Sequence, residues 1–103
     1  MSIKNLPADY LLAAQQGDID KVKTCLALGV DINTCDRQGK TAITLASLYQ
    51  QYACVQALID AGADIDVPNR IGITPLMYAV YNGHTECIKL LLTAGEDINR
   101  RGL

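Results

Sequence analysis

The sequence contains no tryptophan and no phenylalanine, and its five aromatic residues are all tyrosines. Half of the 103 residues are hydrophobic, so a packed core is possible but must be mainly aliphatic, and the length allows one domain, residues 1–103. No apolar run approaches the roughly 18 residues that a membrane helix needs. The first residues lack the apolar segment and the cleavage site of a signal peptide. These absences predict a protein that does not associate with membranes.

Positive charge is not in excess either. Nine Lys and Arg residues face eleven Asp and Glu residues, for a net charge of −2. Nucleic-acid binding draws most of its affinity from cationic contacts to phosphates. Arg37, Lys40, Arg70, Arg100 and Arg101 supply some cations in predicted loops, but the net charge predicts no nucleic-acid partner.

Cysteines with metal-binding spacing are absent. The four cysteines lie 10, 19 and 33 residues apart and form no CxxC motif, which argues against a zinc site or a disulfide scaffold. They are Cys25, Cys35, Cys54 and Cys87. We therefore expect reduced thiols in a cytoplasmic protein, with Cys25 in the core and Cys35 exposed. A redox role for Cys35 is the alternative.

Catalytic motifs are missing as well. His84 is the only histidine, so metal ligation and acid–base chemistry lack a second imidazole. The sequence has no phosphate-binding loop, no Gly-x-Ser-x-Gly motif and no His-Glu-x-x-His motif. We predict a protein that is not an enzyme and uses no cofactor and no metal.

What the sequence does contain is a period of 33 residues. Three kinds of residue recur at this spacing: Gly29, Gly62 and Gly95; Asp31, Asp64 and Asp97; Ile32, Ile65 and Ile98. An apolar triplet at spacing i, i+3, i+4 precedes each glycine: Val22, Cys25 and Leu26; Val55, Leu58 and Ile59; Ile88, Leu91 and Leu92. That spacing marks one face of a helix, so the period predicts stacked copies of a helical unit.

Each complete copy carries signals for two helices. Thr41 and Thr74 are suitable N-caps, and Pro75 suits a first helical position. We expect first helices near 42–49 and 75–82, and second helices near 52–60 and 85–93.

Glycines and turn residues mark where these helices end. Gly62 and Gly95 are expected to stop the second helices, because glycine adopts the left-handed conformation without a Cβ clash. Extended segments at 64–66 and 97–99 are expected to follow them. Hairpin tips are expected at 36–39 and 69–72.

This layout resembles the ankyrin-repeat family over roughly residues 8–101. The third copy matches best, with Gly72-Ile73-Thr74-Pro75-Leu76-Met77-Tyr78-Ala79, then Asn82-Gly83-His84, Ile88, Leu91-Leu92 and Gly95. The second copy has Asp36, Gly39, Thr41, Ala46, Val55, Leu58-Ile59 and Gly62-Ala63-Asp64. The resemblance implies an all-α fold, an ankyrin-repeat α-solenoid of stacked helix-turn-helix pairs joined by β-hairpin-like loops. The implied repeats span about 8–34, which is similar to an N-terminal cap, 36–67 and 69–101.

Two departures from the family pattern concern the second copy. The family usually has His after Thr-Pro-Leu, where Thr44 and Met77 stand here, and Gly-His between the helices, where Gln50 and Gln51 stand in the second copy. We expect these changes to lower the stability of the second repeat, and His84 to be a structural hydrogen bonder.

The end of the array is a further departure. The next hairpin glycine would fall at position 105, and the last repeat of a solenoid normally has a polar outer face, whereas Ile88, Leu91 and Leu92 are apolar. We expect either a fragment of a longer array or another surface over this end, including self-association, and we favour the fragment.

The resemblance implies that hairpin tips and first helices contact a partner protein. The positions concerned are Arg37, Gln38, Lys40, Leu48, Tyr49, Arg70, Ile71, Ile73, Tyr81 and Asn82. If exposed, the five apolar or aromatic members of this set are expected to form one contiguous patch, and the alternative is that some of them pack against a neighbouring loop. The expected function is therefore a protein-binding module. The alternative is an inert structural fragment of a longer ankyrin array.

Overall fold

The computed structural model describes the backbone of residues 5–100 and the side chains of residues 5–95. It contains six helices: α1 (Leu6–Gln16), α2 (Ile19–Ala27), α3 (Ala42–Leu48), α4 (Tyr52–Asp60), α5 (Pro75–Tyr81) and α6 (Thr85–Arg100). Over residues 5–100 there is no strand, and one isolated antiparallel bridge joins Cys35 to Thr41. The expected all-α helix-turn-helix solenoid is confirmed. None of the helices between residues 5 and 100 is both long and apolar enough to span a membrane.

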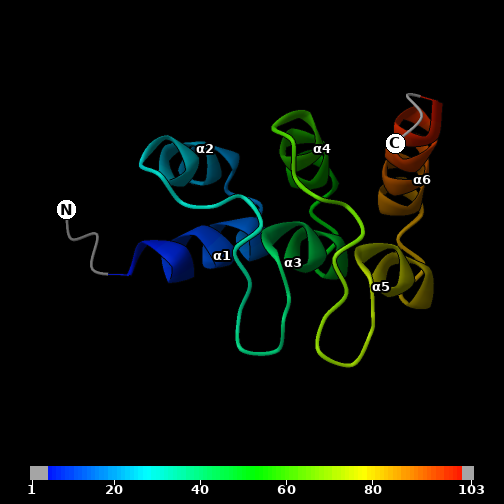
Figure 1. Cartoon of the computed structure of the whole chain (residues 1–103), viewed down its shortest axis with the longest axis horizontal. Coiled ribbons are helices and arrows are strands. Elements are labelled where there is room, and N and C mark those ends of the chain that lie inside the picture. Colours follow the sequence, from blue (N-terminus) through cyan, green and yellow to red (C-terminus); the bar gives the residue numbers. More distant parts are fainter. Residues whose placement is uncertain (1–4, 101–103) are drawn as a thin grey trace.

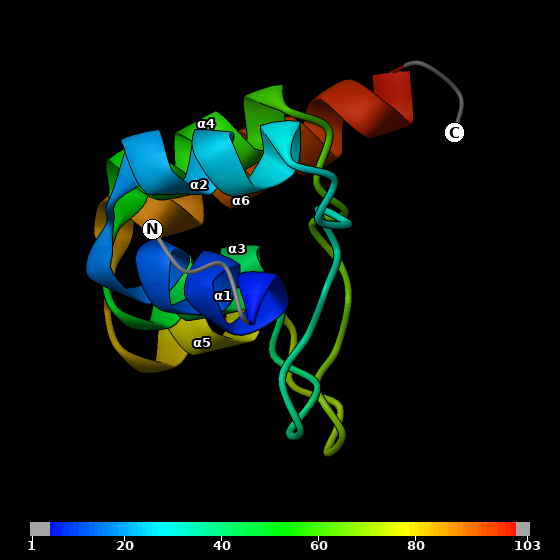
Figure 2. The ribbon, with the colours of Figure 1, turned by 90° about the vertical axis from the view of Figure 1, so that its left-hand side faces the viewer.

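The helices form two layers with the loops projecting from one side. Helices α1, α3 and α5 lie side by side in one layer and α2, α4 and α6 in the other (Figure 1). The loops before α3 and before α5 extend as hairpins away from the helix layers (Figure 2). The order of helices places the two hairpins next to each other at the same edge of the molecule.

Threonine caps start α3 and α5. The Thr41 hydroxyl accepts from the backbone N–H of Thr44 at 3.4 Å, and Thr74 accepts from the N–H of Met77 at 3.2 Å. Each cap satisfies one of the donors that a helix N-terminus leaves without an intrahelical partner. The predicted starts of both helices are confirmed.

The core lies between the two layers and follows the 33-residue period. One alanine from each first helix is almost fully buried, which lets the neighbouring helices approach closely: Ala13, Ala46 and Ala79. The buried residues of the second layer are aliphatic or thiol-bearing: Val22, Cys25, Cys54, Val55, Leu58, Cys87 and Leu91. The predicted core position of Cys25 and the predicted exposure of Cys35 are both confirmed.

Tyr10 is the one fully buried aromatic residue of the described part. Its hydroxyl donates to the carbonyl of Ile32 at 2.7 Å. This bond fixes the loop after α2 against α1, so the polar end of the ring has a partner despite its burial.

The two glycines that were expected to end second-layer helices behave differently. Gly62 follows α4 with a φ of 93°, as predicted. The predicted stop at Gly95 is wrong, because α6 continues to Arg100, and the extended segment predicted at 97–99 is helical. The chain turns after α4 because the next loop has bonding partners, as when the N–H of Asp64 donates to Asn33 Oδ1 at 2.9 Å. Glycine inside a helix costs only about 1 kcal/mol relative to alanine, so without such docking it does not force a stop.

The second repeat keeps the links that its unusual residues were expected to lose. His84 Nε2 lies 3.1 Å from the carbonyl oxygen of Leu48, and Gln51 Nε2 makes the equivalent bond to Gln15 at 3.0 Å. Thr44 Oγ1 lies 2.9 Å from Thr41 Oγ1, a hydrogen bond within the first turn of α3. The expected structural role of His84 is confirmed, and Gln51 replaces it in the second repeat.

One cost remains at Gln50, which has a φ of 62° and is the one non-glycine residue with positive φ over residues 5–100. Its equivalents are Gly17 and Gly83, with φ of 74° and 66°. We expect Gln50→Gly to raise the free energy of unfolding by about 0.5–1 kcal/mol, since the left-handed strain exceeds the added chain entropy of glycine. Urea titration would measure this. Gln56→Gly, the same change inside α4, should lower stability by about 1 kcal/mol, and a loss of stability in Gln50→Gly would contradict the interpretation.

Because several thiols are buried, the stability of the fold is expected to change with pH in the alkaline range. Burial raises the pKa of Cys54 from 9.0 to about 11, with a smaller contribution from Asp18, and burial also raises the pKa of Tyr10, Cys25 and Cys87. Between pH 9 and 11 the unfolded chain releases a proton that folded Cys54 keeps. The folded state then binds more protons, so stability must fall as the pH rises.

We expect Cys54 alone to lower the free energy of unfolding by about 2 kcal/mol by pH 11, with little change below about pH 8.5. Urea titrations across this range would show it. Cys54→Ala should flatten part of the profile relative to the unsubstituted chain. An unchanged profile in this variant would contradict the assignment to Cys54.

Candidate functional site in the paired hairpins

Each hairpin tip is closed by one side chain. Asp36 Oδ1 accepts from the N–H groups of Gln38 and Lys40, both at 2.9 Å. Asn69 Oδ1 accepts in the same way from Ile71 at 3.0 Å and Ile73 at 2.9 Å. The predicted tips at 36–39 and 69–72 are confirmed, and each tip shapes itself through local hydrogen bonds.

The two tips are fastened directly to each other. The N–H of Arg70 donates to the carbonyl of Gln38 at 2.9 Å. Gly39 makes this approach possible, because a Cβ at its position would lie 3.0 Å from Arg70 N and 3.1 Å from Asn69 Cα. The gap between the hairpins is therefore fixed by backbone contacts before any ligand arrives.

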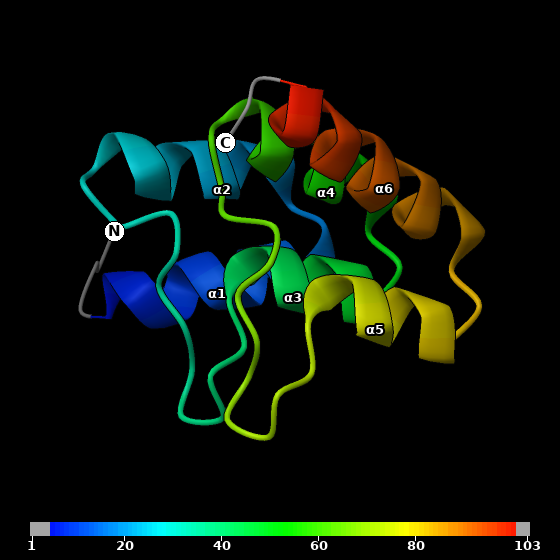
Figure 3. The same ribbon diagram turned by 45° about the vertical axis from the view of Figure 1, so that its right-hand side comes forward.

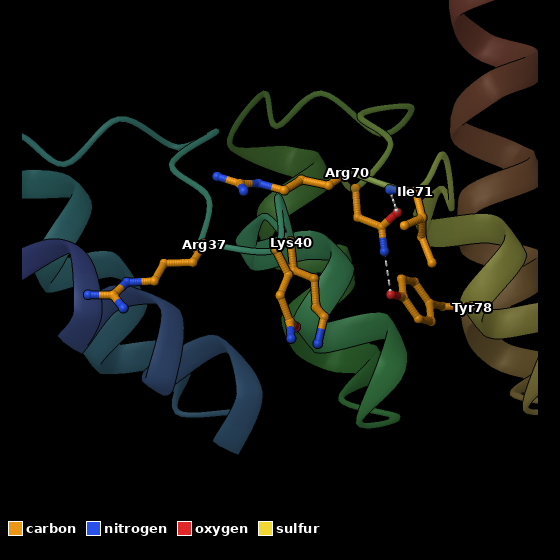
Figure 4. A pocket seen from close by; sticks show the side chains of 7 residues that line it. Arg37, Lys40, Arg70, Ile71 and Tyr78 are labelled. Carbon is orange, nitrogen blue, oxygen red and sulfur yellow. Dashed lines mark hydrogen bonds between the residues drawn. The ribbon is translucent and has the colours of Figure 1, made fainter.

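A pocket of about 430 Å³ opens between the tips. It is lined by Arg37, Gln38, Lys40, Asn69, Arg70, Ile71 and Tyr78. In Figure 4 Arg37 and Arg70 extend from the two tips, Lys40 lies between Arg37 and Tyr78, and Ile71 lies near Tyr78. We call this the hairpin pocket.

The hairpin pocket is lined by an asparagine, Asn69, that has no counterpart in the other tip. Asn69 Nδ2 donates to the Tyr78 hydroxyl oxygen at 2.7 Å. Asp36, at the equivalent position of the second repeat, has no such donor. Tyr78 receives a hydrogen bond from Asn69, so its own O–H proton stays available to an acceptor in the pocket.

A comparison with known protein families gives a match over residues 10–102 to the family described as ankyrin repeats (3 copies). The chain belongs to the ankyrin-repeat family. Members of this family are generally protein–protein interaction modules and typically have no enzymatic activity. The resemblance inferred from the 33-residue period is confirmed.

The ankyrin framework separates the ten predicted contact residues into two groups. Six lie in or beside the hairpins: Arg37, Gln38, Lys40, Arg70, Ile71 and Ile73. Four lie at the opposite ends of α3 and α5: Leu48, Tyr49, Tyr81 and Asn82. A seven-residue helix separates the groups by about 10 Å (Figure 3).

The expected contiguous patch is therefore wrong. Ile71 is 79% exposed at a hairpin tip and Tyr81 is 84% exposed at the far end of α5, while Ile73 and Leu48 are half-buried. The expectation failed because a hairpin tip and the C-terminal end of the helix that follows it lie a whole helix length apart. Arg100 and Arg101, also expected among the loop cations, lie outside the described side chains.

Four residues that matter to these surfaces were not among the ten. Asn69 and Tyr78 line the hairpin pocket, and Met77 and Val80 are exposed on α5. Repeat register offered a signal for Tyr78, because Leu45 at the equivalent position is buried and has no hydroxyl. For Met77 and Val80 the equivalents are Thr44 and Ser47, which are buried under α5.

Proposed function

We propose that this ankyrin-repeat chain binds another protein through its hairpin tips and the adjoining first helices. The observation that carries the proposal is the pair of hairpins, which are fastened to each other and display Ile71 and three cationic side chains around a preformed pocket. A rigid surface loses little conformational entropy on binding, which favours affinity. We extend the proposal to a cytoplasmic location, because the four cysteines are free thiols and three of them are buried.

The second candidate is a structural segment of a longer ankyrin array. The observation that favours it is the outer side of α5, where Met77, Val80 and Tyr81 are all exposed. The equivalent side of α3 is covered by α5. A further helix pair packed on α5 would bury these side chains in the same way.

Affinity capture from the source lysate with two matched pairs of variants tests the proposal. Ile71→Asp should lower recovery of the bound partner about tenfold or more, which corresponds to about 1.4 kcal/mol, since an apolar contact is replaced by a charge. Leu28→Asp is its control, because Leu28 is also exposed but follows α2 in the other layer. Tyr81→Ala is paired with Tyr52→Ala at the start of α4.

The pattern of losses separates binding at the hairpin tips from binding on the outer side of α5. Loss in Ile71→Asp supports binding at the hairpins, and loss in Tyr81→Ala alone supports a partner or repeat on the outer side of α5. Unchanged recovery in both variants would contradict the proposed function.

A further inference from the structure

We propose that the hairpin pocket binds an acidic segment of the partner protein, in which carboxylates lie next to an apolar side chain. This inference rests on the proposed function and names the chemistry of the partner. It is drawn from the distribution of charge, from the donors in the pocket and from the one apolar side chain at its rim.

Charge is segregated on this chain. The hairpin segments 35–41 and 68–74 contain three cations and one acid, so they carry +2 while the other residues of the chain carry −4. The one acid, Asp36, is held by two backbone N–H groups of its own tip. The hairpins are thus a positive site on a negative protein, and such a site attracts an acidic partner.

The pocket cations have no carboxylate of their own. Among the side chains described for residues 5–95, the one ion pair joins Lys89 to Glu86 on α6. None of the seven residues lining the hairpin pocket is acidic. Arg37, Lys40 and Arg70 therefore keep their charge for an outside ligand.

Donors dominate the polar groups of the pocket. Lys40 and Arg70 are donors only, and Tyr78 presents its O–H proton because its oxygen already accepts from Asn69. The side-chain oxygen of Asn69 already accepts from two backbone N–H groups, which leaves the side-chain oxygen of Gln38 as the remaining side-chain acceptor among the lining residues. A site made of donors selects an acceptor, and each of these donors can form a charge-assisted hydrogen bond to a carboxylate.

An apolar side chain at the rim of the hairpin pocket is available to contact an apolar residue of the peptide. Ile71 is 79% exposed and borders the same pocket. A carboxylate held by Lys40 or Arg70 would place the neighbouring side chain of the peptide close to Ile71. An apolar neighbour there would remove both surfaces from water.

A nucleic acid fits these observations less well than a peptide. A polyanion needs cations along an extended track, whereas this chain has a short positive site and the rest of its residues carry −4. Phosphate groups have no preference for Ile71, but an acidic peptide offers an apolar side chain beside its carboxylates. We therefore assign the pocket to a peptide.

Selection of a random linear peptide library on the whole chain tests the inference. We expect selected peptides to be enriched in Asp and Glu beside an apolar residue, and a leading peptide to shift amide resonances of both hairpins. Replacing its Asp and Glu by Asn and Gln should weaken binding about tenfold, and higher salt should weaken it too. Lys40→Gln and Arg70→Gln should each weaken binding by about fivefold or more, whereas Lys23→Gln on α2, the matched control, should not.

Several results would overturn the inference. One is a set of selected peptides without enrichment in Asp and Glu, and another is the failure of every peptide to shift the amide resonances of the hairpins. Equal binding of the uncharged peptide, or binding only when phosphoserine replaces a carboxylate residue, would also contradict it. Saturable shifts of the same resonances by an oligothymidine, stronger than those by the peptide, would also overturn it.

The outcomes separate this inference from the proposed function. If Ile71→Asp abolishes partner capture while selected peptides lack acids, the partner class is wrong and the binding function stands. If neither Ile71→Asp nor Tyr81→Ala changes capture, the proposed function falls whatever the peptide library returns.

Discussion

Replacing Leu58 by alanine is expected to lower the free energy of unfolding by about 3 kcal/mol, within the range of about 2–5 kcal/mol measured for such truncations in protein cores. Leu58 is fully buried in α4, and α4 packs against both α2 and α6. The lost side chain leaves a cavity at the centre of the second layer. Urea titration and thermal unfolding would both report it, with a fall in Tm of about 10 °C or more.

Leu92→Ala is the matched control for Leu58→Ala. The same atoms are removed, but Leu92 is 50% exposed on α6. We expect a loss below about 1 kcal/mol there. Equal losses at the two positions would show that the middle repeat does not hold the stack together.

Replacing Gly39 by alanine is expected to cost about 2–3 kcal/mol, which is large for the addition of one methyl group. Gly39 has a φ of 85°, and the new Cβ would meet the backbone of Asn69 and Arg70 at 3.0–3.2 Å. Backbone atoms cannot rotate away as a flexible side chain can, so the hairpins must separate and the bond from Arg70 N–H to Gln38 must lengthen.

Gly72→Ala separates the two causes. Gly72 has a nearly identical φ of 87°, but no atom lies within 4 Å of its Cβ position. This variant should therefore show the left-handed strain alone, about 1 kcal/mol. The difference between the two variants in urea titration measures the packing of one hairpin against the other, and the absence of a difference would contradict the close approach.

The same pair of variants bears on the hairpin pocket. Gly39→Ala should weaken peptide binding in the pocket, because it moves Lys40 relative to Arg70 and Tyr78. Gly72→Ala should leave binding nearly unchanged if its tip keeps the hydrogen bonds of Asn69. Amide shifts with the same peptide would compare them.

Local signals predicted most of the helices because they act within one turn. The caps at Thr41 and Thr74 and the apolar triplets involve residues three or four apart, and the structure confirms them. The stop at Gly95 failed for the opposite reason. A helix end of this kind depends on what the following loop contacts, and such contacts lie about one repeat away, as between Asn33 and Asp64.

The candidate site was predicted only in part, because local patterns identify residues of a tip but not the contacts that the tip makes. The cations and Ile71 at the tips could be identified as hairpin residues from the repeat register. Asn69 lies in the predicted tip at 69–72, but its bond to Tyr78 could not be predicted, because the two residues meet only when this tip packs on the first helix of its own repeat. The sequence also did not predict that Gln51, which stands where the family has His, would make a replacement bond to the carbonyl of Gln15.

The sequence by itself determined the repeat, the two-helix unit, the caps and the family, since these rest on residue types at fixed short spacings. Only the tertiary structure decided that the hairpins meet through Gly39 and that a donor-lined pocket lies between the tips. Those features depend on how far each repeat lies from the next. That distance is set by side chains packed between repeats rather than by any local pattern.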